Sequence, residues 1–186
     1  MKGRRQLAIV LFVTGVIAGG VATGWRVLRS ELVPVGIGVK APGFAVNTLD
    51  SIPVQKTLAD YRGNVLMINI WATWCAPCRV EMPSIEELHR AYKDKGLRIL
   101  AISVDDAGSE PQIRSFVKEY GLSFEVLHDP KGQEGEVSRD YQTTGYPETV
   151  IVGRDGVIRK KLLGAHDWNS PENRALIDRM LAEKAD

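Results

Sequence analysis

Two strand-length runs of apolar residues constrain the fold of this chain more than any other feature. VLMINIWA at 65–72 and LRILAISV at 97–104 are almost continuously apolar, and the segment between them, at about 75–95, has apolar residues at helical spacing. Continuous apolar runs are typical of strands buried on both faces, and a helix between two such strands connects them in parallel. The sequence therefore predicts a central sheet of the α/β class.

Turn signals and apolar spacing divide the rest of the chain in the same way. Gly and Pro residues separate segments with helical periodicity from segments of strand length. The further expected elements are a short hairpin at 44–54, a helix at 110–120, a strand at 123–129, a short helix at 133–141, a strand hairpin at 148–164 and a helix at 170–183. The last hairpin adds antiparallel strands to a parallel sheet. We therefore predict a three-layer domain over residues 41–186, with a mixed central sheet flanked by helices.

An uncharged, mostly apolar run at 6–25 precedes this domain. As a helix it would be about 30 Å long, which matches the core of a bilayer. The basic flank at 1–5 predicts a cytoplasmic N-terminus, so residues 6–25 would be a transmembrane anchor and residues 26–40 a linker. The domain would then lie on the extracytoplasmic, periplasmic side of the cytoplasmic membrane. A cleaved signal peptide, which would release the domain as a secreted protein, is the alternative, because the run also contains small residues that suit a signal peptidase.

The charge distribution argues against a nucleic-acid partner. The formal net charge is +1, but five of the 24 basic residues precede the first acidic residue, Glu31. The remainder of the chain is therefore net acidic, whereas domains that bind nucleic acids carry a basic surface.

The only two cysteines, Cys75 and Cys78, stand three positions apart in WATWCAPCRVEMP. A structural disulfide at this spacing would close a very small loop and would stabilise the fold little. A zinc site needs four ligands, and the three histidines of the chain are single and scattered. Covalent haem attachment needs a histidine directly after the second cysteine, where this chain has Arg79. No metal and no cofactor is therefore predicted.

Redox chemistry explains both the pair and its position between a strand and a helix. Free backbone N–H groups and the helix dipole stabilise a thiolate at a helix N-terminus, which makes Cys75 the expected nucleophile. Cys78, one turn later, is placed to resolve the mixed disulfide that Cys75 forms. Pro77 suits the first helical turn, where it removes no hydrogen bond. We predict a redox-active disulfide between Cys75 and Cys78.

The motif WATWCAPCRVEMP, followed about 70 residues later by TTGYPETVIVGRDGVI, resembles a bacterial family. It is similar to the membrane-anchored, extracytoplasmic thioredoxin-like proteins of the TlpA, ResA and DsbE (CcmG) group, over residues 41–165. The resemblance implies a thioredoxin-like fold with an N-terminal hairpin extension, at 44–54, and an inserted helix, at 110–120. It also implies that Pro147 has a cis peptide bond and faces the dithiol.

The resemblance extends to further site residues. A cis bond would leave the backbone of Tyr146 free to pair with an extended substrate peptide, and Trp74 would form a hydrophobic rim for it, beside Pro77. The family also has an acidic residue near the dithiol at the position of Glu81. Thioredoxin itself has a buried aspartate at the position of Asn69, and an asparagine cannot exchange a proton. Glu81 is therefore the expected acid of the site.

The function expected from these residues is that of a thiol-disulfide oxidoreductase, more specifically a reductant of protein disulfides. The family suggests apocytochrome c or a copper-assembly protein as the substrate, with a membrane thiol protein as the electron donor. A peroxiredoxin-like peroxide reductase is one alternative, although the proline and threonine expected before a lone peroxidatic cysteine are absent from NIWATWC. A copper chaperone of the Sco type is another, although that family places its cysteines four positions apart.

Overall fold

The computed structural model describes residues 14–15, 19–20 and 34–183. The segment Val35–Asp186 forms one compact unit. The expected transmembrane segment at 6–25 lies almost entirely outside the described residues, as does most of the linker at 26–40. Among the described residues, no helix has both the length and the apolar character needed to cross a bilayer.

A seven-stranded mixed sheet runs through the compact unit, in the order β2-β1-β5-β4-β3-β6-β7. The strands are β1 (Ala45–Thr48), β2 (Gln55–Thr57), β3 (Val65–Trp71), β4 (Leu97–Ser103), β5 (Glu125–His128), β6 (Glu148–Val152) and β7 (Ile158–Leu163). β3, β4 and β5 are parallel to one another, whereas β6 is antiparallel to β3 and β7 is antiparallel to β6. The predicted mixed sheet is confirmed.

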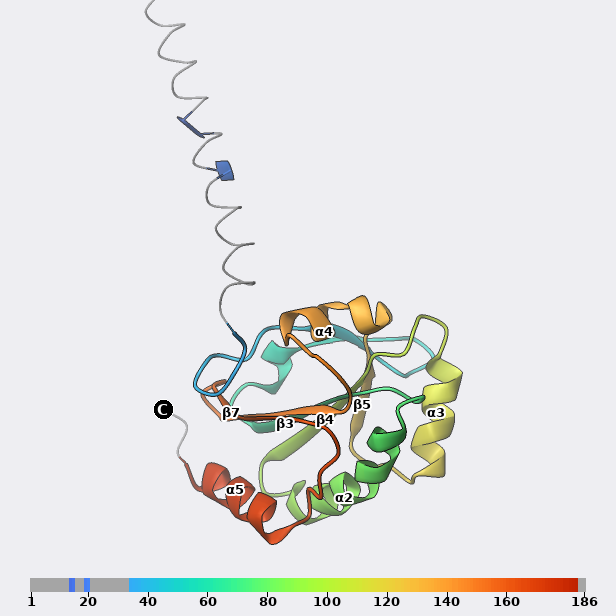
Figure 1. Cartoon of the computed structure of the whole chain (residues 1–186), viewed down its shortest axis with the longest axis vertical. Helices are drawn as coiled ribbons and strands as arrows, with labels where there is room; N and C mark the ends of the chain where they lie inside the picture. The colour runs from blue at the N-terminus through green and yellow to red at the C-terminus, as the bar shows by residue number, and fades with distance from the viewer. Residues whose placement is uncertain (1–13, 16–18, 21–33, 184–186) are drawn as a thin grey trace, which may run out of the picture. The chain divides into compact units, whose positions relative to one another are not determined.

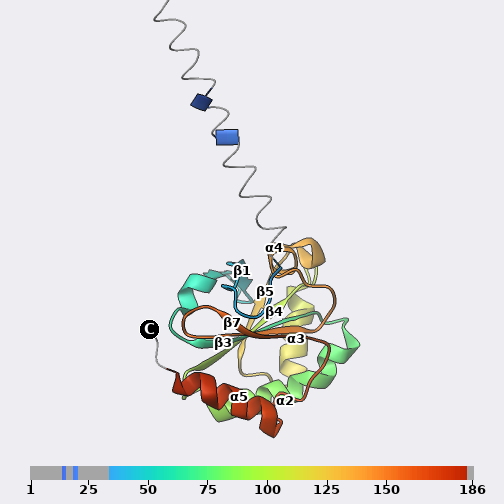
Figure 2. The same cartoon turned by 60° about the vertical axis from the view of Figure 1, so that its left-hand side comes forward.

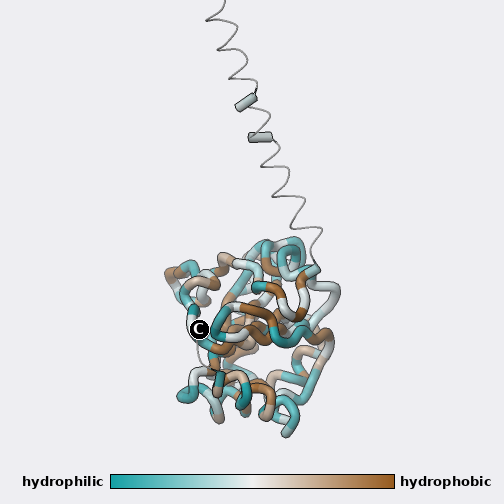
Figure 3. The backbone as a smooth tube through the Cα atoms, turned by 90° about the vertical axis from the view of Figure 1, so that its left-hand side faces the viewer, coloured by the Kyte–Doolittle hydropathy of each residue, from teal (hydrophilic) through white to brown (hydrophobic). Residues whose placement is uncertain are grey.

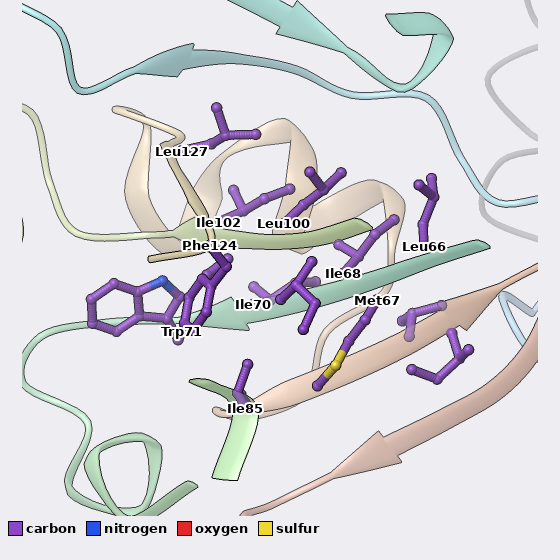
Figure 4. Close-up of a cluster of buried hydrophobic side chains, with 14 of the residues drawn as sticks. Leu66, Met67, Ile68, Ile70, Trp71, Ile85, Leu100, Ile102, Phe124 and Leu127 are labelled. Atoms are coloured by element: carbon purple, nitrogen blue, oxygen red, sulfur yellow. The ribbon is translucent and has the colours of Figure 1, made fainter. Parts of the chain in front are cut away.

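The strand β3 is the centre of this sheet. All seven of its residues are buried, and it pairs with β4 on one edge and β6 on the other. Its side chains alternate between two cores, so Leu66 and Met67 lie on opposite sides of the strand, with Met67 on the same side as Ile85 (Figure 4). Hydrophobic stretches of the backbone run through the middle of the unit (Figure 3). Burial on both faces explains why this run is continuously apolar apart from Asn69.

Helices cover both faces of the sheet. They are α2 (Ala76–Tyr92), α3 (Glu110–Glu119), α4 (Glu136–Asp140) and α5 (Pro171–Ala182). In two views 60° apart, α2 and α5 lie on one side of the sheet and α4 on the other (Figures 1 and 2). The 3-10 helices η1 (Leu58–Tyr61) and η2 (Gly132–Glu134) complete the unit. The helix–sheet–helix layering is therefore as predicted, including the inserted helix α3.

Three expected boundaries differ from the structure. The hairpin expected at 44–54 exists, but its second strand, β2, begins only at Gln55 and pairs antiparallel with β1. The helix expected at 133–141 is divided into η2 and α4, because the backbone of Gly135 is extended. Finally, part of the expected linker belongs to the compact unit, since the backbone N–H of Gly38 donates to the carbonyl of Ile158 (2.9 Å).

Candidate active site

The two cysteines form a disulfide at the N-terminus of α2. Cys75 is the N-cap residue, its Sγ accepts the backbone N–H of Cys78 at 3.2 Å, and the two Cα atoms are 5.3 Å apart. Pro77 lies in the first turn, as predicted, so that the helix begins immediately after Cys75. Cys75 is 4% exposed and Cys78 is fully buried. Of the two sulfur-bearing residues, Cys75 is therefore the one with surface open to an approaching molecule.

The segment around Tyr146 and Pro147 lies beside this disulfide loop. The peptide bond between these two residues is cis, as the resemblance implied. β6 begins directly afterwards, and its first residue pairs with Ile70 near the end of β3. The rings of Trp74 and Tyr146 meet edge to face with centroids 5.8 Å apart. The residue before Cys75 thus contacts the residue before Pro147, which brings the two sequence motifs together.

Glu81 lies one turn after Cys78 on α2, and it is only 1% exposed. Its Oε1 accepts the side-chain amide of Asn69 at 2.7 Å. Its Oε2 accepts the indole N–H of Trp168 at 3.1 Å and the backbone N–H of His166 at 3.2 Å. Burial raises the pKa of Glu81 to about 7, against the lowering effect of these three hydrogen bonds. The carboxyl group can therefore gain or lose a proton near neutral pH.

Sequence reasoning missed the partners of Glu81. From the sequence, Asn69 is only a residue that cannot exchange a proton. In the structure its side-chain amide donates hydrogen bonds to the Glu81 carboxylate and, at 2.9 Å, to Thr149 Oγ1. The one signal for it was a polar residue within the apolar run of β3. Trp168 stands 87 positions after Glu81, and no local pattern could have joined them.

The loop that leads into the disulfide is held by polar contacts on both sides. The backbone N–H and the hydroxyl of Thr73 donate to the buried carboxylate of Asp105, at 2.9 and 2.7 Å. The guanidinium of Arg79 donates to the carbonyl of Thr73 and lies over the ring of Phe116 on α3. These contacts hold both the N–H and the carbonyl of Thr73, and they place the Arg79 cation against α3.

Exposed apolar side chains lie on the segments that adjoin the disulfide and the Pro147 loop. Trp74 is 55% exposed, whereas Trp71 on β3 is buried. Val80 on α2 and Leu163 at the end of β7 are also exposed, and we call these three residues the apolar rim. Leu163 adjoins the Pro147 segment, since the next residue, Gly164, donates to the carbonyl of Pro147 at 2.7 Å. A groove of about 360 Å³ continues from Val80 along α2 to Glu87.

No metal-binding arrangement accompanies these features in the described part of the chain: no group of three or more His, Cys, Asp and Glu side chains there is placed to hold an ion.

The buried carboxyl group predicts a specific pH dependence of stability. The unfolded chain loses the Glu81 proton near pH 4.5, whereas the folded chain keeps it up to about pH 7. The free energy of unfolding should therefore fall between these two values, by up to about 3 kcal/mol from this group. Glu81→Gln should lack this fall. Urea unfolding of the oxidised protein at about pH 4 and about pH 8 measures the free energy of unfolding at both ends of the range.

The exposed Glu87 on the same helix provides the control, since Glu87→Gln should keep the wild-type pH profile. A difference in stability between wild type and Glu81→Gln that stays constant over this pH range would contradict the assignment.

Comparisons with known proteins agree with this geometry. The AhpC/TSA family model matches residues 37–161. The thioredoxin-like protein YneN of Bacillus subtilis is 37% identical over 160 residues, which cover 84% of this chain and 90% of YneN. The thiol-disulfide oxidoreductase ResA of Bacillus cereus is 33% identical over 165 residues, which cover 88% of this chain and 91% of that protein.

Solved structures have the same fold. A Chlorobium tepidum protein described as a thiol:disulfide interchange protein, DsbE, has a TM-score of 0.69 and 28% identity, covering 80% of this chain and 99% of its own. The resemblance of the two sequence motifs to the ResA and DsbE group is thereby confirmed, and with it the activity of a thiol-disulfide oxidoreductase. On these matches and on its CxxC disulfide, the chain belongs to the AhpC/TSA family of thioredoxin-like proteins.

Proposed function

We propose that this protein is a reductant of protein disulfides on the extracytoplasmic side of the cytoplasmic membrane. The observation that carries the proposal is the buried carboxyl group of Glu81, one helical turn behind a Cys75–Cys78 disulfide at the start of α2. The disulfide is the oxidised form that such a reductant reaches after it has acted.

Each turnover transfers two electrons. In the reduced protein, the Cys75 thiolate attacks one sulfur of a substrate disulfide, so that an intermolecular S–S bond forms and the other substrate sulfur leaves as a thiolate. Cys78 then loses its proton, attacks Sγ of Cys75 and releases the second substrate thiolate. The Cys75–Cys78 disulfide that results is reduced again by a donor dithiol.

The Glu81 carboxyl group fits the second step of this reaction. It lies on the helix that carries Cys78, and burial places its pKa at about 7, so that it can accept a proton near neutral pH. When ionised, it also opposes a thiolate in the same buried environment, because like charges raise the pKa values of neighbouring acids. A reduced form that gains little from thiolate stabilisation favours electron donation to the substrate.

The surroundings of the disulfide favour a protein as the substrate. The apolar rim exposes Trp74, Val80 and Leu163 to solvent, and a protein substrate that covers them would remove this apolar area from water. The backbone at Tyr146, beside Trp74, adds a place where an extended peptide could pair. The ResA and DsbE resemblance suggests apocytochrome c or a copper-assembly protein as this substrate, and a membrane thiol protein as the donor.

Trapping in cells tests the proposed reaction. With Cys78→Ser, the mixed disulfide on Cys75 cannot be resolved, so substrate proteins should accumulate as reducible conjugates on non-reducing gels. Cys75→Ser, the matched control, lacks the proposed nucleophile and should give none. Conjugates that form only on Cys75→Ser would reverse the roles of the two cysteines, and conjugates that form equally on both variants would contradict a single nucleophile.

Removal of one rim residue tests recognition of a protein. Trp74→Ala should lower kcat/KM for a protein disulfide by about tenfold, because one buried aromatic contact contributes about 1–2 kcal/mol to an interface. Turnover of a small disulfide such as oxidised glutathione should change less than twofold. Ile52 is also exposed but lies in the turn between β1 and β2, so Ile52→Ala is the control and should match wild type. Equal losses on both substrates would argue against a docking role for Trp74.

Fractionation tests the proposed location. The full-length chain should sediment with membranes, and a protease added outside the cytoplasmic membrane should digest the domain, because the uncharged run at 6–25 has a basic leading flank. A shortened, soluble product would identify that run as a cleaved signal. A domain protected from external protease would overturn the extracytoplasmic placement.

A further inference from the structure

We infer that Asn69 is a positioning residue that holds Glu81 in either protonation state by reversing its side-chain amide. The inference rests on the proposed function only in that it treats Glu81 as a group that exchanges a proton during turnover. It concerns the contacts of three side chains, Asn69 on β3, Glu81 on α2 and Thr149 on β6, which meet in the core behind the disulfide.

The amide of Asn69 is fully buried and uses only one of its two ends. Nδ2 donates to Glu81 Oε1 at 2.7 Å and to Thr149 Oγ1 at 2.9 Å. Oδ1 is buried and has no hydrogen-bond partner. An unpaired buried carbonyl oxygen costs free energy, so its presence on a residue in the central strand calls for an explanation.

The contacts of Glu81 show which of its oxygens can carry a proton. Oε2 accepts from the indole N–H of Trp168 and from the backbone N–H of His166, and both of these groups can only donate. A proton on Oε2 would break one of these hydrogen bonds. Among the described residues, Oε1 accepts only the amide of Asn69, so a proton on Oε1 leaves both of those hydrogen bonds intact.

An amide can satisfy both states of this oxygen. With Glu81 ionised, Nδ2 donates to Oε1 and to Thr149, as the structure shows. With Glu81 protonated, rotation of the amide by half a turn presents Oδ1 to the same two positions. Oδ1 has two lone pairs, which accept the new O–H of Glu81 and the hydroxyl of Thr149. Two hydrogen bonds are kept in each state, and only the unpaired end of the amide changes.

The other titratable side chains around Glu81 do not occupy the place of Asn69 in this oxidised state. On α2, Cys78 is held in the disulfide and carries no proton here. The loop after β7 contributes the ring of His166, which contacts the carbonyl of Leu163 and the ring of Trp168. On β7, the ammonium of Lys160 is bonded to Asn173. In the part of the chain that the structure describes, none of these three side chains forms a hydrogen bond with Oε1.

Nuclear magnetic resonance of the oxidised, full-length protein tests the inference. The Asn69 side-chain N–H protons should carry hydrogen-bonded shifts at about pH 9 and lose them at about pH 5, with the midpoint at the titration of the Glu81 carboxyl carbon. The amide of Asn173 is the control, because both of its ends have partners, Lys160 and the carbonyl of Asp167, and its signals should stay constant through that midpoint. Asn69 signals that do not change while Glu81 titrates would overturn the inference, and this arm needs no variant.

The variant Asn69→Leu provides a second test, because a fixed amide and a reversing amide predict different pKa values for Glu81. If the amide were a fixed donor, its loss would remove a hydrogen bond from the ionised state alone and would raise the Glu81 pKa by about one pH unit. If the amide reverses, the variant loses a hydrogen bond in both states, and the Glu81 pKa should stay within about half a pH unit of wild type. A rise of one unit or more would contradict reversal.

Failure of the proposed function is distinguishable from failure of this inference. A protein that shows the Asn69 reversal but does not reduce protein disulfides would contradict the function alone. A protein that reduces them with an Asn69 amide fixed at every pH would contradict the inference alone.

Discussion

Burial of β3 on both faces and both edges is the constraint on which the rest of the structure depends. Because the strand pairs with β4 and β6 and is covered on both sides, its end at Trp71 has a fixed position. That position determines where the loop to Cys75 begins and where β6 must start, directly after Pro147. The disulfide is therefore placed by a buried strand and not by the exposed residues around it.

The same strand carries Asn69, which connects the buried core to Glu81 through a hydrogen bond. Asn69 is a polar side chain in an otherwise apolar strand, and it is compatible with burial because Glu81 and Thr149 are its partners. The arrangement differs from a buried aspartate at this position, since the acid is now on the helix that carries Cys78. An acid on α2 moves with the resolving cysteine, which keeps the two groups on one rigid element.

The sequence predicted the fold to the extent that local patterns encode it. The apolar runs of β3 and β4, the apolar spacing of the helices and the Gly and Pro residues between segments were sufficient for the layered α/β domain. β2 was placed imprecisely because its three residues, QKT, have neither apolar alternation nor turn signals. For the site, the CxxC motif and the segment at Pro147 were predictable, whereas the burial of Glu81 was not. The carboxyl group of Glu81 is hydrogen-bonded by Trp168 and by the backbone of His166, and both residues are remote from it in the sequence.

The central claim is that the dithiol is a reductant and that Glu81 partly sets its reduction potential. The most direct test is to equilibrate wild type and Glu81→Gln with glutathione buffers at pH 7 and to compare their reduction potentials. The account predicts a wild-type potential near about −250 mV and a higher, more oxidising value for Glu81→Gln, because the variant removes a charge that opposes the thiolate. A wild-type potential above about −180 mV, or a Glu81→Gln potential equal to or below that of wild type, would contradict it.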